Sequence, residues 1–217
     1  MELFNAVRNN DIDRVRELLN SGIDPNTENE RGYTSLMYAS SDGYTDIVEL
    51  LLESGAYPNI KHRFYGHTAL MYATEYSHID IIRILLEYDA DTNIQNRYGD
   101  TSLIYASREG HIEIVRLLLQ SGADPNVKNR YGHTPLIMAS KNGHADIVNL
   151  FLEYDVDPNI KDFHGDAPLI IASGEGYSDI VNLLLKKGAD PNIKDDHGNT
   201  PLIIASGEGY SDIVNLL

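Results

Sequence analysis

Short apolar runs alternate with polar, glycine-centred segments along this chain at an almost fixed interval. The glycines that precede the apolar runs are Gly32, Gly66, Gly99, Gly132, Gly165 and Gly198. The steps between them are 34, 33, 33, 33 and 33 residues. A period held this closely over most of a chain predicts stacked supersecondary repeats, each contacting only its neighbours, in place of one globular core.

One period, residues 129–161, shows the elements that the pattern predicts. It opens with a polar segment around Gly132, which suits a tight turn. Thr134 is then a candidate N-cap, and Pro135 suits the first position of a short helix. A second apolar helix is expected from about Asp146, and an Asp-rich segment ends it. Both helices are too short to be stable alone, so packing against adjacent repeats must stabilise them.

The order of residues within each repeat resembles the ankyrin repeat. A repeat reads G-x-T-P-L, then A, then G-H, then D-I-V-x-L-L-L, then G-A-D-P-N, with local variation. The resemblance covers nearly the whole chain. It implies an all-α repeat solenoid of stacked helix-turn-helix units with short β-hairpin fingers, and a partner bound on the side formed by the finger tips and inner helices. The residue choices within the repeats are similar to those in ankyrin proteins of large DNA viruses and some intracellular parasites.

We expect a single ankyrin-repeat array over residues 1–217. An N-terminal cap repeat is assigned to 1–31, full repeats to 32–65, 66–98, 99–131, 132–164 and 165–197, and an incomplete last repeat to 198–217. Residues 168–184 and 201–217 are identical, which indicates an internal duplication. No polar end repeat follows, so the last repeat should leave apolar side chains partly exposed, either as a contact surface or because the chain is cropped.

Some positions depart from the repeat pattern. Ala167 stands where a capping threonine is expected, at a cost of ~1 kcal/mol to that helix. Asp89 and Asp155 replace a glycine expected in a left-handed conformation, and Ser77 stands where other repeats carry glycine. The single 34-residue step places one extra residue near His62, which we assign to the finger.

Composition narrows the class of partner. The chain carries 33 acidic and 17 basic residues, a net charge of −16, so we expect no nucleic acid partner. It has no cysteine, and no apolar stretch approaches the ~18 residues of a membrane span. We therefore expect no membrane partner and an intracellular, cytoplasmic location, which is the host cytoplasm if the source is a virus or a parasite.

No group of residues in the sequence suits catalysis. Carboxylates are spread along helix exteriors, and the Gly174–Gly176 segment lacks the lysine and hydroxyl residue of a phosphate-binding loop. His78, His111 and His144 recur at one repeat position, which favours a structural role. The chain is accordingly expected not to be an enzyme and to use no metal and no cofactor.

Arginine and aromatic residues gather instead at the finger tips and on the inner helices, and both types are enriched at interface hot spots. The candidate partner-binding residues are Tyr33, Phe64, Tyr65, Arg97, Tyr98, Arg130, Tyr131, Tyr72, Tyr76, Tyr105, Arg108 and Lys141. The sequence thus predicts a monomeric, non-catalytic module that binds a protein of unknown identity. Two alternatives stay open: a structural array that self-associates through its uncapped C-terminal end, and an acidic mimic that binds basic proteins.

Overall fold

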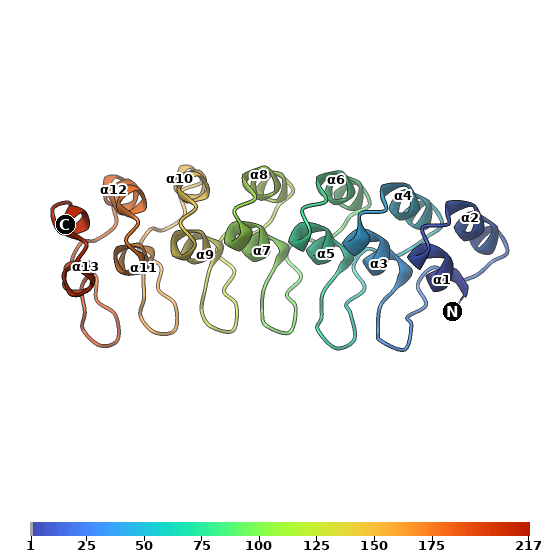
Figure 1. The fold of residues 1–217 in the computed structure, drawn as a ribbon, viewed down its shortest axis with the longest axis horizontal. Coiled ribbons are helices and arrows are strands. Elements are labelled where there is room, and N and C mark those ends of the chain that lie inside the picture. Colours follow the sequence, from blue (N-terminus) through green and yellow to red (C-terminus); the bar gives the residue numbers. More distant parts are fainter. Residues whose placement is uncertain (1) are drawn as a thin grey trace. The chain divides into compact units, whose positions relative to one another are not determined.

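The computed structural model describes residues 2–217, and this part of the chain forms fourteen helices and no β-strand (Figure 1). The chain divides into two compact units, Met1–Tyr105 with Arg116–Ala123 and Ala106–Val115 with Asp124–Leu217. The division passes through α7 (Ser102–Glu109) and α8 (Ile112–Gln120). The expected all-α repeat fold is confirmed.

The first unit contains two layers of helices. Its complete helices are α1 (Glu2–Arg8), α2 (Ile12–Asn20), α3 (Ser35–Asp42), α4 (Thr45–Glu53), α5 (Ala69–Glu75) and α6 (Ile79–Glu87). Helices α1, α3 and α5 pack side by side as an inner layer, while α2, α4 and α6 form the outer layer. Leu51 and Ile82 of the outer helices are fully buried between the layers, as their apolar spacing predicts.

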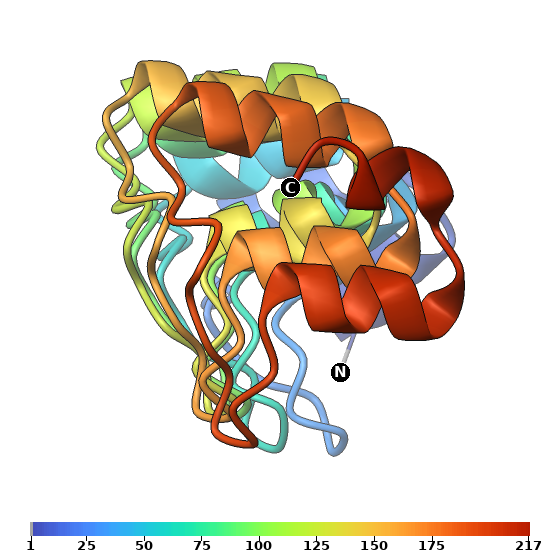
Figure 2. The same cartoon turned by 90° about the vertical axis from the view of Figure 1, so that its left-hand side faces the viewer.

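The second unit repeats this arrangement. Its complete helices are α9 (Pro135–Lys141), α10 (Ala145–Glu153), α11 (Pro168–Glu175), α12 (Ser178–Lys186), α13 (Pro201–Glu208) and α14 (Ser211–Val214). Figure 2 shows α10 and α12 in one layer and α9, α11 and α13 in the other, which agrees with their contacts. Phe151 of α10 is fully buried.

Threonine caps begin most inner helices. Thr34, Thr68 and Thr134 have extended backbones, and their hydroxyls accept hydrogen bonds from backbone N–H groups three residues on, at 3.2–3.3 Å. Each bond satisfies one of the N–H groups that a helix start leaves without an intrahelical partner. Ala167 has the same extended backbone and makes no such bond, as predicted.

A glycine after each of several inner helices leaves room for a ring from the next repeat. Gly43 has φ 78°, and a Cβ atom built there would lie 2.8 Å from the His78 ring. His78 Nε2 donates to the Ser41 carbonyl at 3.0 Å, and His144 Nε2 donates to the Arg108 carbonyl at 2.9 Å. These bonds confirm the structural role predicted for His78 and His144.

Asparagine side chains form hydrogen bonds to the backbone of the next repeat. Asn59 Nδ2 donates to the Asp89 carbonyl at 3.0 Å, and Asn59 Oδ1 accepts from Asp91 N at 2.8 Å. Asn159 makes the equivalent pair with Gly188 and Asp190 in the second unit. Because both ends of one amide are used, each asparagine fixes the spacing of two neighbouring repeats.

Candidate functional site

Each finger is a loop that precedes an inner helix and is closed by backbone hydrogen bonds. The fingers, named here by their glycines, span residues 29–33, 62–67, 96–100, 129–133, 162–166 and 195–199. In the Gly32 finger, Asn29 N donates to the Tyr33 carbonyl and Gly32 N donates to the Asn29 carbonyl, both at 2.9 Å. These loops turn like hairpins, but no residue of the described fingers is in a β-strand.

One side chain at the base of each finger accepts two further backbone hydrogen bonds. The anchors are Asn29, His62, Asn96, Asn129, Asp162 and Asp195. Asn96 Oδ1, for example, accepts from Tyr98 N at 2.8 Å and from Asp100 N at 3.0 Å. Short polar side chains commonly hold turns in this way, and here they fix the direction in which the tip residues project.

The Gly66 finger is one residue longer than the others. His62 N donates to the His67 carbonyl at 2.7 Å, across one more residue than the Asn29–Tyr33 bond spans. This confirms the position assigned to the extra residue. His62 Nδ1 accepts from Phe64 N and Tyr65 N, both at 3.2 Å.

The electrostatics of that anchor depend on its burial. Burial lowers the pKa of His62, and the Arg31 backbone and the Glu28 carboxylate only partly oppose this effect. The neutral ring is the form that accepts hydrogen bonds at Nδ1, so burial and finger geometry favour the same protonation state.

Two of the candidate tyrosines lie in a buried aromatic cluster of the first unit. Tyr72 and Tyr105 are 7% and 6% exposed. The His67 ring stacks on Tyr72 at 5.2 Å, and its Nε2 is 2.7 Å from the Tyr105 hydroxyl. Half-buried Tyr33 lies 5.7 Å from Tyr72; burial first, and then the hydrogen bond to Tyr33, raises the pKa of Tyr72. These rings support the fingers and offer a partner little surface.

Four other candidates in the first unit are exposed aromatic side chains. Phe64 and Tyr65 are each 50% exposed at the tip of the Gly66 finger, Tyr98 is 48% exposed in the next finger, and Tyr76 is 54% exposed at the end of α5. The exposed Arg97 side chain donates to the Arg63 carbonyl at 2.7 Å, and its backbone N–H donates to the Tyr65 carbonyl at 2.9 Å. These bonds hold the two fingers next to each other.

The second unit presents a smaller set. Arg130 and Lys141 are exposed, Tyr131 is 56% exposed, and partly buried Arg108 pairs with Glu109 at 3.0 Å. Phe163, which the sequence interpretation left out, is 63% exposed. The sequence contained a signal for it, because Phe163 is an aromatic residue at a finger tip, as Phe64 is.

A cleft of about 420 Å³ lies beside these residues in the second unit, with Tyr131, His133, Asp166 and Ile170 in its lining. His133 Nε2 is 3.5 Å from the buried Asp162 carboxylate. Burial raises the pKa of Asp166, and the nearby carboxylates of Asp162 and Asp195 raise it further. No three His, Asp or Glu side chains within residues 2–217 are placed to hold a metal ion.

The last described repeat exposes apolar side chains. Ile203 is 54% exposed, Leu202 42% and Leu216 40%, whereas Ile213 is buried. The expected exposure therefore concerns α13 and the segment after α14. Among the helices that the structure describes, none combines the length and the apolar character needed to cross a lipid bilayer.

The geometry defines a repeat protein whose exposed aromatic and basic residues project from loops on a helical scaffold. The family model for ankyrin repeats (3 copies) matches residues 3–96, 58–129, 86–162, 103–195 and 164–217. The chain belongs to the ankyrin-repeat family.

Comparison with a solved structure agrees. The ankyrin repeat domain of Bcl-3, described as a unique member of the IkappaB protein family, is 31% identical with a TM-score of 0.87, over 99% of this chain and 98% of that chain. Ankyrin repeats are protein–protein interaction modules.

Curated relatives match over shorter stretches. A putative ankyrin repeat protein of fowlpox virus, FPV222, is 46% identical over 59 residues, which is 27% of this chain and 8% of the relative. Human ankyrin repeat domain-containing protein 39 is 41% identical over 54 residues, 25% of this chain and 30% of the relative. The matches thus span less than a third of either relative.

Proposed function

We propose that the chain is a non-catalytic module that binds a protein partner through its finger tips and the adjoining inner-helix ends. The observation that carries this proposal is the exposure of large aromatic side chains at the finger tips, Phe64, Tyr65 and Tyr98 in the first unit and Tyr131 and Phe163 in the second. Large side chains exposed on ordered loops bury much area at little entropic cost when a partner docks.

Charge supports the same surface. In a chain with a net charge of −16, the basic residues Arg97 and Arg130 directly precede Tyr98 and Tyr131 in the sequence. Arginine beside tyrosine is a frequent combination at interface hot spots, because each offers a large planar group with hydrogen-bond donors. Arg97 is also held by its bond to the Arg63 carbonyl, which reduces the entropy that binding would remove.

A crosslinking pull-down from the cells that naturally make the chain tests the proposal. The wild-type chain is compared with a variant carrying Tyr65→Ala, Tyr98→Ala and Tyr131→Ala. Matched controls are Tyr57→Ala and Tyr154→Ala, which remove tyrosines that are 67% and 47% exposed outside the fingers. We expect the triple variant to lose partner recovery by about tenfold or more, since each hot-spot truncation costs over ~1 kcal/mol.

Equal recovery by the triple variant and the controls would remove the finger tips from the proposed surface. If the chain instead recovers many basic proteins, and added salt releases all of them, the result would favour the acidic-mimic alternative.

Self-association is a second candidate function, favoured by the exposure of Leu202 and Ile203 on α13. Sedimentation velocity at several protein concentrations tests it, with Ile203→Lys as the variant that should abolish association. A single monomer peak at all concentrations would contradict it.

A further inference from the structure

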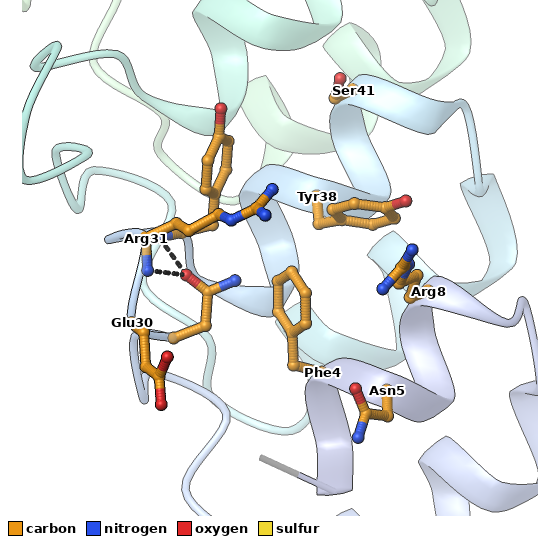
Figure 3. A pocket seen from close by; sticks show the side chains of 9 residues that line it. Phe4, Asn5, Arg8, Glu30, Arg31, Tyr38 and Ser41 are labelled. Carbon is orange, nitrogen blue, oxygen red and sulfur yellow. Dashed lines mark hydrogen bonds between the residues drawn. The ribbon is translucent and has the colours of Figure 1, made fainter.

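Two guanidinium groups and two aromatic rings line a cavity in the first unit. It measures about 460 Å³, within the ~300–1,000 Å³ range of ligand pockets, and lies between α1, α3 and the Gly32 finger. Phe4 and Arg8 come from α1, Tyr38 from α3 and Arg31 from the finger (Figure 3). All of these elements belong to one compact unit.

The floor of the cavity is an aromatic pair. The rings of Phe4 and Tyr38 meet edge to face, with centroids 5.2 Å apart. Both side chains are only partly buried, so apolar ring surface remains open to the cavity. Burial first, and then the interaction with Asp42, raises the pKa of Tyr38.

The two guanidinium groups lie on either side of this pair, as Figure 3 shows. Neither Arg8 nor Arg31 makes an ion pair with any residue that the structure describes. Glu30 also lines the cavity, but Figure 3 shows its carboxylate directed away from both arginines.

The side chains of the equivalent arginines in the next two fingers are each held by a neighbouring group, through an ion pair in one case and a hydrogen bond in the other. Arg63 pairs with Glu28 at 2.8 Å, and Arg97 donates to the Arg63 carbonyl at 2.7 Å. The backbone of Arg31 is nevertheless well held, because its N–H donates to Asn29 Oδ1 at 2.9 Å. The chain thus positions this arginine without neutralising it.

We propose that this cavity receives an acidic side chain of a partner protein, with the carboxylate between Arg8 and Arg31 and the neighbouring apolar side chain of the partner against Phe4 and Tyr38. Guanidinium groups bind carboxylates through paired, charge-assisted hydrogen bonds, and aromatic floors favour an adjacent apolar group. The proposal rests on the proposed function in one respect, that the ligand is a protein.

The net charge of the chain limits the attraction between the cavity and an acidic group to short range. A net charge of −16 repels an acidic partner at long range. At about 0.15 M salt, screening over ~8 Å confines the interaction to groups inside the cavity. The site therefore selects a single carboxylate beside an apolar side chain over a strongly acidic surface.

Nuclear magnetic resonance titration tests the proposal with defined probes. The intact chain is titrated with acetyl-Phe-Glu-amide, acetyl-Phe-Gln-amide, acetyl-Phe-Lys-amide and inorganic phosphate, while the arginine Nε–H and aromatic signals are recorded. We expect the Glu peptide to shift the signals of Arg8, Arg31, Phe4 and Tyr38 together, and to bind about tenfold more tightly than the Gln peptide.

Variants connect the shifts to the two arginines. Arg8→Gln and Arg31→Gln should each weaken the Glu peptide by about fivefold, as expected for partly exposed ion pairs. Arg16→Gln is the matched control, because it removes the same charge from an exposed position of α2 outside the cavity. Thermal unfolding of each variant checks that the first unit stays folded.

The alternatives give different results. Equal affinity for the Glu, Gln and Lys peptides, or no coupled ring shifts with the Glu peptide, would overturn the proposal. Phosphate that binds the arginines as tightly as the Glu peptide would identify a nonspecific anion site and would overturn it as well. None of these measurements uses Tyr65, Tyr98 or Tyr131, so failure here and failure of the finger-tip surface are separate outcomes.

Discussion

His62 connects the shape of the Gly66 finger to pH. Only its neutral ring accepts the N–H groups of Phe64 and Tyr65 at Nδ1, and burial lowers its pKa below the ordinary value of about 6.5. As pH falls, the unfolded chain therefore takes up this proton before the folded chain does. The stabilisation is complete above the unfolded pKa and is lost as pH falls through the lowered one. Facing charges from Glu28 and Arg97 act in opposite directions on this balance.

We predict that His62→Asn reduces the loss of stability between about pH 7.5 and pH 5. An Asn side chain can accept the same kind of bond, as Asn29 and Asn96 do in their fingers. Urea unfolding of both proteins across this pH range gives the two slopes. Because the other seven histidines are common to both, parallel curves would show that His62 contributes nothing.

Single residues were partly predictable from the sequence. The positive φ angles of Ser77, Asp89 and Asp155, 61°, 59° and 55°, follow from their places in a glycine-rich register. The unequal burial of Tyr38, Tyr72 and Tyr105 does not follow, although their repeat positions are equivalent. It depends on which aromatic ring of a neighbouring element packs against each tyrosine. Phe4 packs against Tyr38, whereas the His67 ring packs against both Tyr72 and Tyr105.

At the scale of one helix, α11 shows what a missing cap costs. Ala167 is fully buried and keeps the extended backbone of a cap, with no side-chain acceptor for the helix start. Thr134 occupies the equivalent place in the second unit, also fully buried, and accepts from Ile137 N at 3.3 Å. We predict that Ala167→Thr raises the free energy of unfolding by ~1 kcal/mol, measured by urea denaturation.

Ala167→Val is the matched control, because valine has the shape of threonine without its hydroxyl. Ala167 packs against Ile170 and Ile193, so added methyl groups alone could change stability. If the valine variant gains as much as the threonine variant, the gain comes from packing and the capping explanation is wrong.

The helices could be predicted from the sequence more fully than the contacts between side chains. The threonine caps, proline starts and glycine ends marked the helices because they act within a few residues of sequence. The anchor of each finger was harder to identify, since Asn96 or Asp162 is one polar residue among several and only the folded loop shows what its oxygen accepts. The convergence of Arg8 and Arg31 on one cavity was likewise not predictable, because helix α2 and its flanking loops lie between them in the sequence.

At the scale of the whole molecule, the repeat period gave the family and the fold. It gave no sign of the division through α7 and α8, because the glycine spacing on both sides of that point is 33 residues. A period records local sequence constraints, whereas compact units depend on how densely the elements contact one another. The same is true of the candidate surface. The sequence identified the residues of the finger tips, but it did not predict how far their side chains are exposed.

Net charge leads to a prediction for the whole chain. With 33 acidic and 17 basic residues, acidic side chains repel one another in the folded state more than in the expanded chain. Three of the ion pairs, Arg14–Glu2, Arg14–Glu17 and Arg63–Glu28, involve an arginine that is at least half exposed. Such exposed pairs contribute little to stability, so their screening by salt costs little.

Raising NaCl from ~0.01 to ~0.1 M shortens the screening length from ~30 to ~10 Å. We therefore expect Tm to rise over this range in calorimetry, with an equal osmolarity of sucrose as the control. A Tm that falls with salt would mean that attractive pairs outweigh the net repulsion.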